Sequence, residues 1–295
     1  MNKWIRRCVL AVIAVAAIVG VAVAVGLQKG DARAARKVQV AVAAVPFTDD
    51  TNAVVRGQYL FASRGCTECH GADGAGATMA DDGKGTLLAG PNITRGNPTL
   101  AAYKEVDWVR SIRHGVAPTG RVLRLMPSQD YNRLTDIDLA AIVAYARQLA
   151  PQSGRLHGTV ELPLPARVIY GFGGIPEAYE KINHALPPSQ PVAQAATAEY
   201  GAYVVQMCIG CHGPNLEGGK IAGGPPEWPA AARLAPGEGS VMPRYTNAAD
   251  FMAMLKSGKR ADGTSIAAMP FDSLSKLSDG DASALFVYLS SLGRR

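Results

Sequence analysis

The sequence has little of several things that would point to particular protein classes. Five cysteines in 295 residues are too few for a disulfide-dense scaffold of this length. Glycine (32) and proline (19) together make up about 17% of the chain, below the roughly 25–30% of low-complexity chains. Apolar residues make up 48% and charged residues 18%, so a core can form and the chain is not expected to be mainly disordered. The length is typical of about two domains.

Excess positive charge is absent outside the first 37 residues. Residues 1–37 carry seven basic side chains and one acidic side chain, whereas the other 258 residues carry 23 of each. A nucleic-acid-binding face would need basic residues clustered on the folded part, so no nucleic-acid partner is expected. The chain also lacks a nucleotide fingerprint, a Ser-His-Asp arrangement and a catalytic carboxylate pair, so we expect no catalysis of its own and no small-molecule substrate.

One long uncharged run is present, at residues 8–27. Its 20 residues are enough to cross a hydrocarbon core of about 30 Å as a helix. We therefore interpret residues 1–37 as a membrane anchor or signal segment. The length favours an uncleaved anchor, although Ala22-Val23-Ala24 offers a cleavage pattern. Basic residues on both sides weaken the positive-inside signal, and Cys8 is expected to lie within the membrane.

A five-residue motif occurs twice. Cys66-Thr67-Glu68-Cys69-His70 and Cys208-Ile209-Gly210-Cys211-His212 both read C-x-x-C-H, and their first cysteines lie 142 residues apart. These two motifs contain every cysteine except Cys8. A repeated motif of this kind indicates that the chain contains two copies of one unit.

The segments that follow the motifs match as well. The matching pairs lie 143 residues apart and are Trp108/Phe251, Met126-Pro127/Met269-Pro270, Asp136/Asp279 and Tyr145/Tyr288. A unit of about 100 residues is an ordinary domain size. We therefore expect one domain at 51–150 and a second at 195–295. A proline-rich connector at 151–194 joins them.

Each unit is predicted to be helical, and the fold class to be all-α. The expected helices are residues 51–63 (Thr51 or Asn52 as cap), 100–114 (ended by Gly115), 135–149 (Thr135 as cap) and one beginning at Ser278, with a short helical piece within 167–184. No long segment alternates with period two, so no sheet is expected.

The C-x-x-C-H motif has a specific chemistry. Its two thiols lie on one side of a short helical turn and can form thioethers with haem vinyl groups, while the histidine is placed to ligate the iron. On these residues each unit resembles a class I cytochrome c domain. The whole chain resembles a membrane-anchored dihaem c-type cytochrome, with two tandem cytochrome c-like domains after one transmembrane helix. The resemblance covers about 51–150 and 195–295.

The resemblance implies a ligand set for two covalently attached haem c groups. Cys66, Cys69, Cys208 and Cys211 would form the thioethers, and His70 and His212 would be the proximal iron ligands. Met126 and Met269 would be the distal ligands; they follow the first cysteines of their motifs by 60 and 61 residues. In the family a Gly-Pro element accepts a hydrogen bond from the proximal histidine, and Gly90-Pro91 and Gly224-Pro225 are the candidates.

Other interpretations compete at each position. Two C-x-x-C pairs could form a Cys₄ zinc site, a redox motif or disulfides, but these leave the histidines unexplained, and zinc pairs are usually about 15–20 residues apart. Among the other methionines, Met242 also precedes a proline but has no methionine counterpart in the first unit. The remaining candidates are less specific: His114 as a surface or capping residue, His157 and His184 as solvated or structural residues, Trp108 and Phe251 as haem-edge or core residues, and Arg110, Arg113, Arg121 and Arg124 as propionate partners or exposed charges.

The resemblance implies an electron carrier in a bacterial inner membrane, single-pass, with its haem domains in the periplasm. It would pass single electrons between a dehydrogenase and an oxidase or another cytochrome. A related possibility is the cytochrome subunit of a dehydrogenase complex. The alternative is a peroxidase-like dihaem enzyme, which needs one haem with an open or displaceable distal position. The aligned methionines argue against that alternative.

Overall fold

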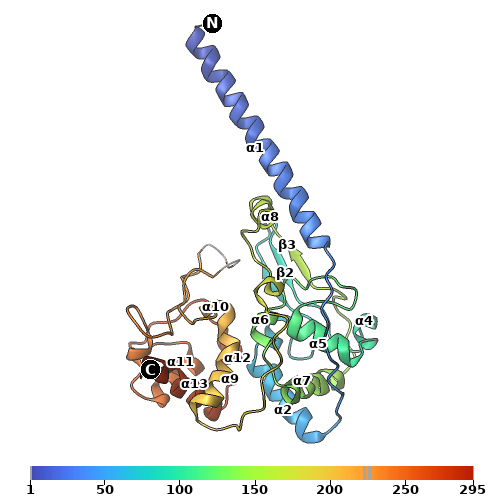
Figure 1. The fold of residues 1–295 in the computed structure, drawn as a ribbon, viewed down its shortest axis with the longest axis vertical. Coiled ribbons are helices and arrows are strands. Elements are labelled where there is room, and N and C mark those ends of the chain that lie inside the picture. The colour runs from blue at the N-terminus through green and yellow to red at the C-terminus, as the bar shows by residue number, and fades with distance from the viewer. Residues whose placement is uncertain (1, 222–223, 225–226, 295) are drawn as a thin grey trace.

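A long helix leads into a body of two helical units (Figure 1). The computed structural model describes residues 2–221, 224 and 227–294. Helix α1 (Lys3–Ala35) extends away from the body, and its apolar residues from Val9 to Val21 are exposed. In the described part of the chain, this is the one helix long and apolar enough to cross a membrane.

The first unit is built around two packed helices, α2 (Thr51–Ser63) and α7 (Asp136–Gln148). Leu60 and Phe61 of α2 and Leu139 of α7 are almost fully buried. Close approach depends on Gly57, where a Cβ would overlap the Ala141 carbonyl of α7. The other helices of this unit are α3 (Cys66–His70), α4 (Pro98–Ala101), α5 (Glu105–His114) and α6 (Ser128–Tyr131).

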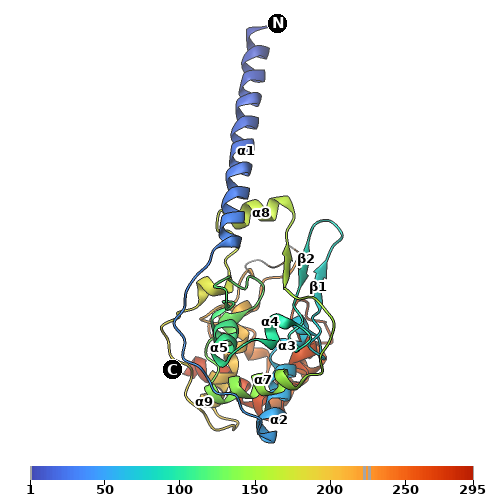
Figure 2. The same cartoon turned by 90° about the vertical axis from the view of Figure 1, so that its right-hand side faces the viewer.

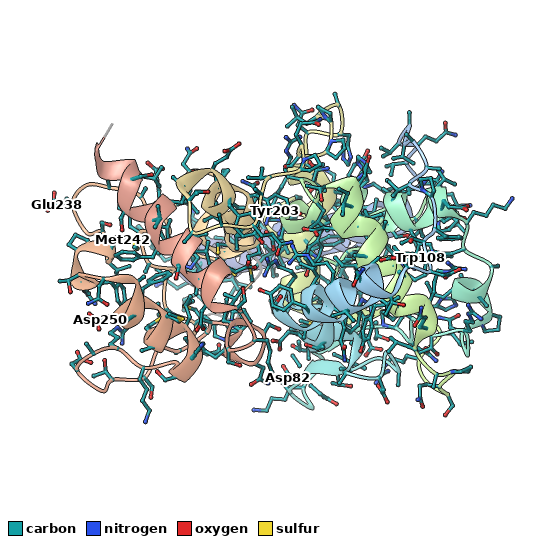
Figure 3. All side chains as sticks on the ribbon, turned by 90° about the horizontal axis from the view of Figure 1, so that it is seen from below. Asp82, Trp108, Tyr203, Glu238, Met242 and Asp250 are labelled. Carbon is teal, nitrogen blue, oxygen red and sulfur yellow. The ribbon has the colours of Figure 1, made fainter. Side chains whose placement is uncertain are left out.

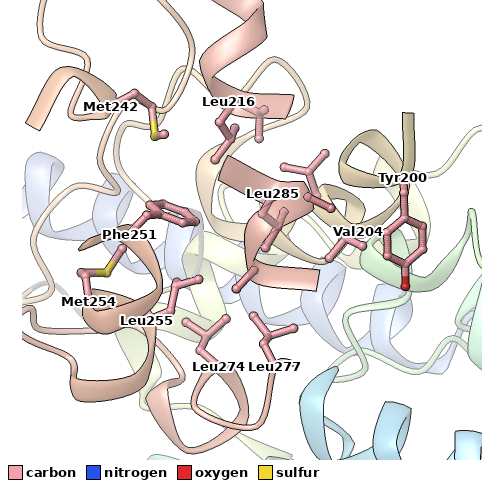
Figure 4. Packing of buried hydrophobic residues seen from close by; sticks show 14 of the residues in the cluster. Tyr200, Val204, Leu216, Met242, Phe251, Met254, Leu255, Leu274, Leu277 and Leu285 are labelled. Carbon is pink, nitrogen blue, oxygen red and sulfur yellow. The ribbon is translucent and has the colours of Figure 1, made fainter. Parts of the chain in front are cut away.

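The second unit repeats this plan with α9 (Ala198–Val204) and α13 (Asp279–Ser291). Gly201 of α9 meets the Ala284 carbonyl of α13, as Gly57 meets Ala141. Figure 4 shows Phe251, Leu285 and Val204 within one apolar core. The unit also contains η2 (Val205–Cys208), α10 (Ile209–His212), η3 (Met242–Arg244), α11 (Ala248–Ser257), α12 (Phe271–Leu274) and η4 (Leu292–Arg294).

The expectation of no sheet was wrong. Strands β1 (Thr78–Asp81), β2 (Leu87–Ala89) and β3 (Thr159–Glu161) form a small antiparallel sheet in the order β1-β2-β3. Strands of three or four residues are too short for alternating side chains to be recognised, since their pairing rests on main-chain hydrogen bonds. Strand β3 belongs to the connector, so the sheet ties the connector to the first unit.

Most helix boundaries agree with the sequence-based expectations. Thr135 and Ser278 cap α7 and α13 as predicted, because each hydroxyl accepts a hydrogen bond from the third residue of its helix. The predicted cap of α2 was wrong. The side chain of Asp50, and not that of Thr51 or Asn52, accepts a hydrogen bond from the Ala53 N–H. The helix expected at 100–114 is two helices, α4 and α5, since Lys104 adopts an extended conformation at the start of α5.

The connector contains the two short helical pieces α8 (Leu164–Gly171) and η1 (Ala178–Lys181). Helix α8 packs against the last turns of α1 and lies across its axis (Figure 2). The connector then contacts the first unit, where the Ser189 N–H donates to the Arg133 carbonyl at 3.3 Å, before it reaches α9.

Candidate functional site

The first C-x-x-C-H motif forms the single-turn helix α3. Gly65 precedes it with φ of 82° and Gly71 follows it with φ of 74°, conformations that glycine adopts readily. These two residues confine the helix to one turn. The turn places Cys66, Cys69 and His70 on the wall of one cavity.

His70 is held in a defined orientation. Its Nδ1 lies 3.0 Å from the Pro91 carbonyl oxygen and must donate, because a carbonyl only accepts. Burial lowers the pKa of His70, which favours the neutral ring. The Nε2 atom then carries a lone pair that can ligate a metal. This contact agrees with the role predicted for Gly90-Pro91.

The cavity has a volume of about 540 Å³, within the usual range for a cofactor site. Met126 lines it together with the three motif residues, so the structure brings together all four residues predicted for the first unit. Much of the remaining wall is apolar and includes Phe61, Ile93, Leu100, Trp108, Ile112, Leu123, Leu125, Leu134 and Ile142. Two thiols, an unprotonated imidazole nitrogen, a thioether and an apolar wall fit a covalently attached haem.

The thiols of the motifs are uncharged. Burial raises the pKa of Cys66 to about 12 and that of Cys69 to about 11, and it also raises the pKa of Cys208 to about 12. A structural zinc site needs four ligands close together, and the described residues contain no group of three or more His, Cys, Asp or Glu side chains that could hold a metal ion. The structure therefore supports the haem interpretation over the zinc interpretation.

The second unit shows the same local design. His212 is 7% exposed, burial lowers its pKa, and its Nδ1 lies 2.8 Å from the Ala232 carbonyl oxygen. The prediction that Gly224-Pro225 accepts this bond was wrong, and Pro225 lies outside the described residues. Backbone pairing between Gly219 and Ala231 brings Ala232 beside the histidine.

The two distal methionine candidates occupy equivalent places. Met126 and Met269 precede α6 and α12, and each carbonyl accepts a hydrogen bond at 2.9 Å from the residue two positions on. Met269 is partly buried against the core of the second unit. Met242 is 8% exposed and belongs to that core, which Figure 4 shows. Met79 lies on β1, with its sulfur 3.1 Å from Cys69 Sγ.

Only some of the residues predicted to lie near a haem edge or its propionates line the cavity. Trp108, Arg121, Arg124 and His157 line the cavity, whereas Phe251 lies in the core of the second unit. Arg110 and Arg113 pair instead with Asp107 and Asp136. Of the two roles predicted for His114, surface or capping residue, the surface role was wrong: His114 is 7% exposed, and its Nδ1 lies 2.9 Å from Nδ1 of His184. The sequence could not show this contact, because it joins α5 to the connector.

The two units contact each other reciprocally. The Tyr59 hydroxyl on α2 donates to Asp281 of the second unit at 2.8 Å, and the Tyr203 hydroxyl on α9 donates to Asp138 of the first unit at 2.6 Å. Asp138 and Asp281 are repeat equivalents, each in the first turn of its unit's last helix. Figure 3 shows Tyr203 at the junction of the two units. The repeats therefore pack with approximate two-fold symmetry.

The two C-x-x-C-H turns lie at this junction. The Ser273 hydroxyl of α12 donates to Glu68 of α3 at 2.7 Å, and Asp130 of α6 packs against Gly210 of the second motif. The buried Arg64, two residues before Cys66, forms an ion pair with Asp281 of the second unit. Each motif thus packs against the short helix that follows the other unit's Met-Pro pair.

Comparison with known proteins agrees with this geometry. Residues 54–150 match the family model "Cytochrome c", and residues 194–289 match "Cytochrome C oxidase, cbb3-type, subunit III". The chain is 28% identical over 172 residues to the gluconate 2-dehydrogenase cytochrome c subunit of Pantoea cypripedii, covering 55% of this chain and 38% of that protein. It is 30% identical over 132 residues to the fructose dehydrogenase cytochrome subunit of Gluconobacter japonicus, covering 41% of this chain and 26% of that protein. The matches thus span less than half the length of either relative.

Proposed function

Because the chain belongs to the cytochrome c family and contains two cytochrome c domains, we propose that it is a membrane-anchored carrier of single electrons with two covalently bound haem c groups. The observation that carries this proposal is the cavity of the first unit, where Cys66, Cys69, His70 and Met126 meet. In the second unit His212 has the same bond to a backbone carbonyl as His70.

The residues have distinct roles in this proposal. Cys66 and Cys69 hold one haem and Cys208 and Cys211 the other, while His70 and His212 are the proximal ligands. Met126 and Met269 are the distal ligands, and their soft thioether sulfur favours ferrous iron and raises the reduction potential. Bound haem supplies reversible one-electron chemistry. The protein orients the histidines through Pro91 and Ala232 and excludes water with the apolar wall.

The partners are redox proteins. Both relatives are named as cytochrome subunits of dehydrogenases. We propose that this chain accepts electrons from a dehydrogenase, as a subunit of its complex or as a separate carrier. It then passes them to an oxidase or another cytochrome. Substrate chemistry would occur on the partner, because His70 and Met126 would hold one iron and His212 and Met269 the other, which would leave neither iron open to a substrate.

Helix α1 anchors the protein in a bacterial inner membrane in this proposal. The haem domains then lie in the periplasm and residues 1–7 in the cytoplasm. The exposed apolar surface of α1 supports the anchor. Digestion of spheroplasts with an added protease tests the orientation: residues 38–295 should be degraded without lysis.

Absorption spectroscopy with added carbon monoxide or cyanide tests the ligation. We expect two low-spin haems, a methionine-sulfur band in the oxidised near-infrared spectrum and no rapid ligand binding. Met126→Ala and Met269→Ala should each open one iron to carbon monoxide. A high-spin haem that binds carbon monoxide rapidly in the unmodified protein would contradict the carrier and favour the peroxidase-like enzyme.

A further inference from the structure

Helix α8 is joined to α1 by close backbone packing. A Cβ on Gly26 of α1 would lie 2.8 Å from a methyl of Val168 and 2.9 Å from the Phe172 ring, and a Cβ on Gly171 would overlap the Gly26 carbonyl. One turn later, a Cβ on Gly30 would lie 3.2 Å from the Arg167 carbonyl oxygen. Small residues at such positions allow helix backbones to approach closely. Figure 2 shows α8 lying across the axis of α1.

Polar contacts fix this arrangement. Arg33 donates to the Tyr170 carbonyl at 2.7 Å and forms an ion pair with Glu180, and Arg36 forms ion pairs with Glu177 and Glu180. Glu177 is 3% exposed and also accepts a hydrogen bond from the Tyr170 hydroxyl. The last turns of α1 and the segment 164–181 therefore form one unit, so α8 has a defined height along α1.

The position of α8 along the axis of α1 coincides with the end of the apolar run of α1. The apolar residues end at Leu27, and α8 meets α1 at Gly26 and Gly30. These two glycines lie about 6 Å apart along the helix axis. Because Gly26 contacts Val168 and Phe172, that edge of α8 lies nearer to the membrane-spanning part of α1. The Tyr170 edge lies nearer to the body, where Tyr170 is 5% exposed.

The outer surface of α8 is apolar and uncovered. Leu164, Ile169 and Phe172 are 54%, 51% and 54% exposed. Charged groups lie beside them: Lys29 Nζ is 5.6 Å from the centroid of the Phe172 ring, and the half-exposed Arg167 pairs with Asp31 at 3.1 Å. Exposed apolar side chains with adjacent basic groups at the height of a bilayer surface match acyl chains below and phosphate headgroups around them.

We propose that α8 together with Phe172 is an interfacial element that lies in the lipid surface on the same side as the haem domains. This inference rests on the membrane anchor of the proposed function. The contact of α8 with the lipid surface adds a second attachment to that of α1. Two attachments restrict rotation of the body, so the first haem domain would keep one orientation relative to the bilayer.

Photolabelling of the full-length holoprotein tests the proposal. The protein is reconstituted into vesicles of phosphatidylethanolamine and phosphatidylglycerol that contain a phospholipid with a diazirine in its acyl chain. After illumination, labelled residues are located by mass spectrometry. We expect label in residues 8–27 and in residues 164–172, and none on α2. Val55 of α2 is 62% exposed. Figure 1 shows α2 at the end of the body opposite α1.

Matched variants separate the lipid contact from chance reactivity. A Leu164→Gln, Ile169→Gln double variant should carry less label in 164–171 and keep it in 8–27, whereas the control Val55→Gln should match the unmodified protein. Label in 8–27 but none in 164–172 of the unmodified protein would overturn the inference and leave the anchor intact, which is the result expected if a protein partner covers α8. Absence of label from both segments would overturn the anchor and the inference together.

Discussion

Asp281 offers a sharp prediction because it joins the two repeats through a buried ion pair. Its side chain is 3% exposed, that of Arg64 is 4% exposed, and the carboxylate also accepts hydrogen bonds at 2.8 Å from Tyr59 and Tyr200. Burial alone disfavours the charge on Asp281, but Arg64 and the donated hydrogen bonds outweigh it and lower the pKa of this carboxyl.

Asp281→Ala is expected to destabilise the fold because it leaves the buried Arg64 without its ion-pair partner. Removal of one member of a buried ion pair costs about 3–5 kcal/mol, because the other charge stays buried without compensation. For a chain of this size, each kcal/mol lowers the melting temperature by about 2–4 °C, so we expect a decrease of roughly 6–20 °C. The repeat-equivalent Asp138→Ala serves as the matched control. It should cost less, about 1.5–3 kcal/mol, because its partner Arg56 is 17% exposed and can be rehydrated.

Scanning calorimetry of the holoprotein at neutral pH measures both variants. The double variant Arg64→Met, Asp281→Ala should recover part of the loss, because it removes the stranded charge. The lowered pKa of Asp281 adds a pH signature. Its carboxylate stabilises the fold above the unfolded pKa of about 3.9 and loses this effect as the pH falls through the lower folded value. A decrease below about 2 °C for Asp281→Ala, or losses that add in the double variant, would refute the reasoning.

Three further predictions concern single residues. Met126→Ala and Met269→Ala should each lower one of two midpoint potentials and leave the other nearly unchanged in a spectroelectrochemical titration, because the thioether favours ferrous iron. Burial raises the pKa of Asp130 to about 7, because the buried carboxyl group is more stable when it is neutral. The fold therefore loses stability as the pH rises from the unfolded pKa of about 3.9 through 7. Asp130→Asn should raise the melting temperature at pH 8 by about 2–8 °C and give no gain near pH 4. Gly57→Ala and Gly201→Ala should each reduce haem incorporation in their own unit, measured by mass spectrometry of haem peptides, because a Cβ would push apart the first and last helices.

Much of the fold could be predicted because local chemistry determines it. The C-x-x-C-H turns, the caps Thr135 and Ser278 and the end of α5 at Gly115 depend on residues close in sequence. The duplication added longer-range information, since it selected Met126 over its rivals, and Met126 lies on the cavity wall.

Features that depend on contacts between distant segments were missed. The carbonyl that meets His212 belongs to Ala232, and the Gly-Pro dipeptide was misleading. The distance in sequence from the histidine would have identified the accepting residue, because Pro91 follows His70 by 21 residues and Ala232 follows His212 by 20. The His114–His184 contact and the Tyr59–Asp281 hydrogen bond join segments 70 and 222 residues apart. No local pattern predicts such contacts.

A potentiometric titration of the full-length protein tests the central claim most directly. The account predicts that both haems are low-spin and are reduced reversibly in two one-electron steps, for a total of two electrons per chain. Uptake of a single electron, or a haem that stays high-spin throughout, would contradict a carrier with two methionine-histidine haems.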